Sequence, residues 1–132
     1  MGEKFSIIVC GSRNFVDKDF LFKKLDFLLQ NKKNITIIEG GQKSFDKKGR
    51  FYYGADCFAS NYAKVRNFNL ITKEADWDTH GKAAGPIRNS EMLDLNPDAC
   101  VGFLDKNSKN IGTLNMLNKA TKKGIIVRQY II

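Results

Sequence analysis

The sequence predicts an α/β fold in one domain, residues 1–132, with a mostly parallel five-stranded sheet covered by helices on both faces. Three observations lead to this prediction. Short runs of apolar, β-branched residues alternate with segments whose apolar residues recur at helical spacing, as in successive βαβ units. A length of 132 residues suits one domain rather than two. Apolar residues make up 42% and charged residues 27%, which excludes a chain disordered throughout.

The first elements are the clearest. Residues 5–10, FSIIVC, are short, apolar and β-branched, which is typical of a buried strand. Asp17 is a suitable N-cap for a helix over residues 18–30, in which leucines recur at helical spacing. Residues 35–39, ITIIE, predict a second buried strand, which ends at Gly40 and Gly41.

The next segment has a different character. Residues 42–53, QKSFDKKGRFYY, are polar, carry a net charge of +3 and end in three aromatic residues. They predict an extended loop or a hairpin inserted between two regular elements. Helical periodicity returns over residues 55–66, and residues 70–75 predict a weaker third strand.

The last third of the chain repeats the alternation. Residues 76–85 predict a loop, and Pro86 suits the first turn of a helix that ends near Leu95. Residues 98–104 predict a fourth strand. Gly112 and Thr113 open a helix that ends before Gly124, and residues 125–131 predict the fifth strand.

The ligand site of a parallel α/β sheet lies beyond the carboxyl ends of its strands. Four segments of this chain occupy such positions: residues 11–14, 40–41, 76–88 and 110–113. They hold most of the glycines and several isolated charges, so we expect them to form the functional site.

Two of these segments suit a phosphate. Gly11 would let the backbone approach a ligand, while Ser12 and free amides hold a phosphate and Arg13 adds a charge-assisted bond. Gly112 and Thr113 place glycine and a hydroxyl at another predicted helix start. The alternatives are an ordinary βα turn and an ordinary threonine N-cap. Neither the G-x-G-x-x-G fingerprint nor a Walker A motif is present.

Arg88 falls in the first turn of its predicted helix, where the helix dipole disfavours a cation. An anion bound at that helix start would remove the conflict. The alternative is a surface arginine paired with Glu91 or Asp94. Asp56 could bind a ribose hydroxyl or favour its helix dipole, and Trp77 could stack on a base or pack as a loop anchor.

The net charge and the cysteine content indicate which partners and which cellular compartment to expect. A net charge of +8 favours anionic partners without choosing among them. Three unpaired cysteines and no leader-like segment predict a protein of the reducing cytoplasm. One histidine and no C-x-x-C argue against a metal site, and no apolar run is long enough to span a membrane.

Taken together, the motifs resemble a known family. Gly-Ser-Arg follows the first strand, Gly-Gly the second, and Gly54-Ala55-Asp56 opens the second helix. The most specific part is the block 75–92, which runs from Ala-Asp-Trp through HGKAAGPIRN to Met92. This order resembles the YspA/YpsA-related branch of the SLOG superfamily, many of whose members come from phages and prophages.

The resemblance implies a Rossmann-like three-layer domain, distantly related to LOG phosphoribohydrolases and DprA. It implies a nucleotide or nucleotide-derived ligand, such as an ADP-ribose-like molecule, with no required cofactor, and self-association, plausibly as a dimer. Its motifs and the segments above predict these ligand-binding residues: Gly11, Ser12, Arg13, Gly40, Gly41, Asp56, Trp77, Lys82, Gly85, Arg88, Asn89, Gly112 and Thr113.

Two departures from the family pattern bear on function. The LOG motif Gly-Thr-x-x-Glu ends here in Met116, which cannot transfer a proton, so only Asp56, Asp76 and Glu91 remain as weak catalytic candidates. The second departure is the insertion 42–53, which could form a lid, an oligomer contact, a nucleic-acid arm or a simple solvated hairpin. Nucleic acid would be bound through the following basic residues: Lys43, Lys47, Lys48 and Arg50. Three functions therefore stay open: a nucleotide sensor or sequestering protein, a nucleotide-processing hydrolase, and a protein that binds single-stranded nucleic acid.

Overall fold

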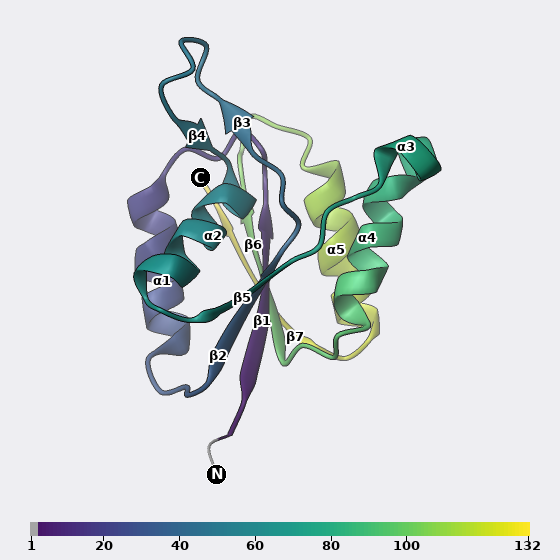
Figure 1. Cartoon of the computed structure of the whole chain (residues 1–132). Helices are drawn as coiled ribbons and strands as arrows, with labels where there is room; N and C mark the ends of the chain where they lie inside the picture. The colour runs from purple at the N-terminus through teal and green to yellow at the C-terminus, as the bar shows by residue number, and fades with distance from the viewer. Residues whose placement is uncertain (1–2) are drawn as a thin grey trace.

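A computed structural model describes residues 3–132 and shows one sheet between two layers of helices (Figure 1). The sheet has the strand order β5-β2-β1-β6-β7, and every neighbouring pair is parallel. Its strands are β1 (Phe5–Gly11), β2 (Ile35–Glu39), β5 (Asn69–Thr72), β6 (Ala99–Leu104) and β7 (Ile126–Ile131). The predicted α/β fold class and five-stranded sheet are therefore confirmed, and the sheet is entirely rather than mostly parallel.

Two helices cover each face of the sheet. Helices α1 (Lys18–Leu29) and α2 (Ala55–Val65) lie on one side, and α4 (Ala84–Leu93) and α5 (Ile111–Lys122) on the other (Figure 1). Asp17 caps α1 as predicted, since its carboxylate accepts a hydrogen bond from the Phe20 amide at 3.0 Å.

The alternation of side chains along β1 produces two separate cores. Ile7 and Val9 face α1 and α2, whereas Ile8 and Cys10 face α4 and α5. Both faces of the central strands are thus buried, which explains why their sequences are apolar without interruption. None of the helices within residues 3–132 has the length and apolar character needed to cross a membrane.

The smaller elements include the main departures from expectation. Residues 42–53 form a hairpin, one of the two predicted alternatives, with strands β3 (Ser44–Phe45) and β4 (Tyr52–Tyr53). Residues 76–85 are not simply a loop, because α3 (Trp77–His80) and a 3₁₀ turn (Gly81–Ala83) lead directly into α4. The Asp76 carboxylate starts α3 by accepting from the Thr79 amide at 3.1 Å.

Two predicted boundaries were wrong in a way that affects the site. Strand β5 ends at Thr72 rather than at residue 75. Helix α4 begins at Ala84, two residues before Pro86, so Arg88 lies in the second turn of the helix rather than in the first. The remaining boundaries agree within one or two residues, and Gly124 follows α5 at a φ of +81° as predicted.

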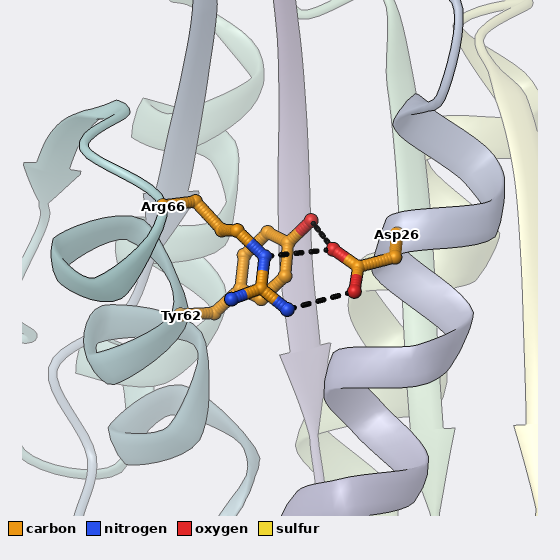
Figure 2. Close-up of polar contacts among 3 residues, drawn as sticks. All are labelled: Asp26, Tyr62 and Arg66. Carbon is orange, nitrogen blue, oxygen red and sulfur yellow. Dashed lines mark hydrogen bonds and ion pairs between the residues drawn. The ribbon is translucent and has the colours of Figure 1, made fainter.

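Helices α1 and α2 are joined by a polar contact around Asp26 (Figure 2). One carboxylate oxygen accepts from the Tyr62 hydroxyl at 2.8 Å and from Arg66 Nε at 3.0 Å, and the other accepts from Arg66 Nη2 at 2.8 Å. The hydrogen bonds from Arg66 hold the pKa of Asp26 below its usual value. This contact fixes the spacing of the two helices on the face opposite α4 and α5.

Candidate functional site

A cleft of about 500 Å³ opens at the carboxyl end of the sheet. The strand order reverses between β1 and β6, and a cleft beyond the carboxyl ends of the strands at such a point is the usual ligand position in this architecture. All predicted ligand-binding residues except Gly41 line it: Gly11, Ser12, Arg13, Gly40, Asp56, Trp77, Lys82, Gly85, Arg88, Asn89, Gly112 and Thr113.

The loop after β1 is held rigidly against its neighbours. The Ser12 amide donates to the Phe103 carbonyl at 2.9 Å, and the Ser12 carbonyl accepts from the Ala55 amide at 3.1 Å. Gly11 is required here because an added Cβ would lie 2.5 Å from Ala55 Cβ and closer still to the Phe103 carbonyl. Ser12 is buried at the floor, while Arg13 is exposed at the rim.

Arg88 lies at the centre of the cleft. Its side chain is buried, with the whole residue 9% exposed, and its Nη1 donates to the Gly40 carbonyl at 2.7 Å. Its Nε donates to Asn89 Oδ1 at 3.0 Å. The predicted conflict with the helix dipole was wrong because Arg88 lies in the second turn of α4. Neither Glu91 nor Asp94 makes an ion pair with it.

The charge of Arg88 is only partly balanced. Within residues 3–132 no carboxylate oxygen lies within 4.0 Å of its guanidinium, and the hydrogen bonds found both go to neutral oxygens. A buried charge without a close counter-charge is costly. The cleft therefore presents a positive group, with donors on Nη2, that an anion would stabilise.

Asp56 is an acidic residue of the cleft wall, and it is buried in the first turn of α2. One of its oxygens accepts from the Gln42 amide at 3.2 Å. Burial, reinforced by the charge of Glu39, raises its pKa to about 7, even though Arg88 acts in the opposite direction. At neutral pH Asp56 is thus partly protonated and offsets only part of the charge of Arg88.

Gly40 separates these two groups. A Cβ built on Gly40 would lie 2.8 Å from Arg88 Cζ and 2.9 Å from Asp56 Oδ2. Glycine at this position is therefore what allows the guanidinium and the carboxyl group to approach the end of β2 together.

The opposite wall is built from α4 and the start of α5. Asn89 is buried, and its amide donates to the Gly112 carbonyl at 3.2 Å and to Asn115 Oδ1 at 3.0 Å. The N-cap of α5 is Asn110, at a φ of +55°, so the alternative of a Thr113 N-cap was wrong. Thr113 is instead buried on the cleft wall.

Trp77 and Lys82 form the outer rim. Both come from the short helical segment before α4, and Trp77 is 47% exposed. Gly85 lies beneath the indole, since a Cβ there would meet the ring at 3.5 Å. The rim thus offers an exposed aromatic face next to a basic side chain.

The remaining candidates lie elsewhere. Gly41 turns away from the cleft, at a φ of +75°, and its amide donates to Glu39 Oε1 at 2.6 Å. Asp76 is exposed and caps α3, and hydrogen bonds from Thr79 lower its pKa. Glu91 is exposed on α4 and does not line the cleft. Of the catalytic candidates, the structure brings only Asp56 into the cleft.

Several lining residues were not singled out in the sequence: Cys10, Gln42, Ser108, Lys109 and Asn115. Cys10 ends a predicted strand, so strand periodicity could have indicated it. Gln42, Ser108 and Lys109 depend on how loops fold back over the sheet, and Asn115 lies on α5. A hydrogen bond with Cys100, together with burial, raises the pKa of the Cys10 thiol.

Comparison with known proteins places the chain in a family. A model of the YspA, cpYpsA-related SLOG family matches residues 5–80. The chain belongs to this SLOG family. It is also 30% identical over 127 residues to the Gene 61 protein of Mycobacterium phage D29, with 92% of each chain covered. No solved structure matches the chain significantly.

The resemblance to the LOG motif implies a glutamate at the position that Met116 occupies in this chain. The side chain is 1% exposed and packs in the core beneath α5 with Ile8 and Leu104, outside the cleft. In this SLOG protein that position therefore supports the core and supplies no acid.

Proposed function

We propose that the chain is a phage-type SLOG protein that binds a nucleotide or a nucleotide-derived anion in the cleft. The observation that carries the proposal is Arg88, a buried guanidinium at the carboxyl end of the sheet that has no counter-charge within 4.0 Å among residues 3–132. A phosphate oxygen near Nη2 would supply that charge, which is a strong interaction in a partly buried site.

The surrounding residues suit the rest of such a ligand. Ser12 and Thr113 offer hydroxyls on opposite walls, and Trp77 offers a flat ring on which a base could stack. A cleft of about 500 Å³ is in the size range of small-molecule sites. The phage relative supports a phage-encoded protein with a sensing or sequestering role. A cytoplasmic location and self-association remain predictions.

Thermal unfolding with a panel of nucleoside mono- and diphosphates, NAD and ADP-ribose tests the proposal. A ligand at about 100 times its Kd adds about 2.7 kcal/mol to the free energy of unfolding, which raises Tm by about 10 °C in a domain of this size. The variant Arg88→Ala, and Arg88→Met, which better preserves volume, should lose this shift. Arg128→Ala should keep it, because that side chain bonds only the Val127 carbonyl at the far edge of the sheet. No shift with any compound would contradict the proposal.

A second function, hydrolysis of an N-glycosidic or phosphate bond, is favoured by Asp56. A carboxyl group with a pKa of about 7 in a ligand cleft suits proton transfer near neutral pH. Incubation with nucleoside monophosphates and NAD, followed by chromatography for free base and phosphate, tests it. Turnover that Asp56→Asn abolishes, while ligand binding persists, would establish the hydrolase; binding without turnover would leave the sensing role.

A further inference from the structure

The hairpin of residues 42–53 exposes an unusual amount of aromatic surface. Phe45, Phe51 and Tyr52 are 59%, 53% and 45% exposed, although they lie within eight consecutive positions. Tyr53 alone packs against the core under α1 and α2. The hairpin is thus fixed at its base by one ring, while the other three rings lie outside both cores of the described chain, residues 3–132. Clustered exposed apolar side chains commonly mark an interaction surface.

The exposed rings have a regular arrangement. Phe45 and Tyr52 are cross-strand partners, with ring centroids 4.2 Å apart. The Lys43 ammonium lies 4.8 Å from the centroid of the Tyr52 ring. One face of the hairpin therefore carries two adjacent rings with a cation beside them.

The same segment concentrates positive charge. Lys43, Lys47, Lys48 and Arg50 stand against one acid, Asp46, which gives the net charge of +3 within a chain of +8. Asp46 is already bonded to Arg50 Nε at 3.1 Å. The two lysines at the tip are exposed and have no acidic neighbour within 4.0 Å among residues 3–132.

The hairpin is attached next to the cleft. Its Ser44 hydroxyl donates to the Arg13 carbonyl at 2.9 Å, and the Gly54 amide donates to the Phe15 carbonyl at 3.0 Å. Figure 1 shows β3 and β4 standing above the edge of the sheet at which β1 ends. The hairpin therefore projects into solvent from a fixed base.

We infer that this hairpin binds single-stranded nucleic acid. Exposed rings stack on unpaired bases, whereas the bases of a duplex are already stacked and unavailable to them. The lysines and the arginine supply contacts to the phosphates that connect those bases. An anionic membrane would satisfy the charges but gives no reason for two adjacent flat rings. The inference stands apart from the proposed function, because it uses none of the buried residues of the cleft.

The charge contribution can be tested by fluorescence anisotropy with a fluorescein-labelled oligodeoxythymidylate of about 20 nucleotides. With four phosphate contacts, the logarithm of affinity should fall with the logarithm of salt concentration at a slope of about −3. The pair Lys47→Gln and Lys48→Gln should reduce the slope to about −1.4. The matched pair Lys4→Gln and Lys33→Gln removes the same charge at the amino ends of β1 and β2 and should leave it unchanged. Equal effects of the two pairs would overturn the inference.

Substitution of the aromatic residues is the second part of the test. Phe45→Ala and Tyr52→Ala should each weaken binding of the same oligonucleotide about tenfold. Phe27→Ala, on α1 and 64% exposed, should not change it. No binding at about 50 mM salt, a preference for duplex, or binding only to phosphatidylserine vesicles would each overturn the inference. The hairpin variants should keep any nucleotide-induced Tm shift and Arg88→Ala should keep oligonucleotide binding, so failure at one site is distinguishable from failure at the other.

Discussion

The cleft and the hairpin are both basic and lie side by side, yet they hold their charge in opposite ways. In the cleft, Arg88 is buried and oriented by the Gly40 carbonyl and by Asn89. On the hairpin, Lys47 and Lys48 are exposed at a turn, and the aromatic residues near them face solvent. A buried, oriented charge suits one small ligand in one pose, whereas mobile exposed charges suit a polyanion that can bind in many registers. The difference predicts that changes to the buried residues around Arg88 affect stability and small-ligand binding together, while changes to the exposed residues of the hairpin affect neither.

The largest expected effect is the pH dependence contributed by Asp56. An unfolded aspartate loses its proton near pH 4, whereas folded Asp56 keeps it until about pH 7. The folded state therefore binds more protons over this interval, and the free energy of unfolding falls by about 3 kcal/mol between pH 4 and pH 7. Urea unfolding across this range measures it.

Asp56→Asn is the control for that prediction. Glu39 is buried too, and desolvation raises its pKa in the same direction, so both variant and wild type should lose stability as the pH rises. Subtracting the pH dependence of the unfolding free energy of the variant from that of the wild type isolates the contribution of Asp56. A difference that does not change with pH would show that Asp56 is ionised like an ordinary surface carboxylate, and the contrast between the two regions would lose its electrostatic basis.

Gly40→Ala tests whether the fold and the cleft require glycine at this position. Its methyl group would displace the Arg88 guanidinium and approach Asp56, at a cost of about 2 kcal/mol in the free energy of unfolding. The nucleotide-induced Tm shift should disappear as well. Gly112→Ala is the matched change on the other wall, where an added Cβ meets nothing within 4 Å, and stability should not fall. Equal losses in the two variants would contradict the geometry of the cleft.

The sequence was sufficient to predict the sheet and most of the cleft. Apolar strands followed by Gly11 and Gly40 are local signals, and the rule for carboxyl ends of parallel strands brings their loops together. Helix α3 was missed because four residues are too few to show periodicity, although Asp76 carried a capping signal. The burial of Arg88 was also missed, since a guanidinium bonded to a distant carbonyl leaves no trace in its neighbours along the chain.

The contact around Asp26 lies outside both the cleft and the hairpin, so a change there is a reference for the effect of an ordinary ion pair on stability. Its pKa is lowered, so its contribution is present above about pH 4 and is lost as the pH falls through the folded value. Asp26→Asn keeps an acceptor for the Tyr62 hydroxyl but removes the charge facing Arg66. Because the ion pair is largely exposed, solvent screens it, and we expect Tm at pH 7 to fall by only about 3 °C. The difference in Tm between variant and wild type should disappear near pH 3. A difference in Tm that stays the same at all pH values would show that packing, rather than charge, causes the loss.

The smallest expected effect is on the hairpin, and it tests the comparison most directly. Phe45→Ser with Phe51→Ser removes two exposed rings that lie outside both cores, so the free energy of unfolding should change by less than about 0.5 kcal/mol. Tyr53→Ser is the matched change at the base, where the ring packs against the core, and it should cost about 2 kcal/mol. If the exposed pair proved as costly as Tyr53, those rings would belong to the fold, and the hairpin would have no surface free for a partner. If they cost nothing, stability does not explain these two exposed aromatic rings, which is the outcome that a binding surface on the hairpin predicts.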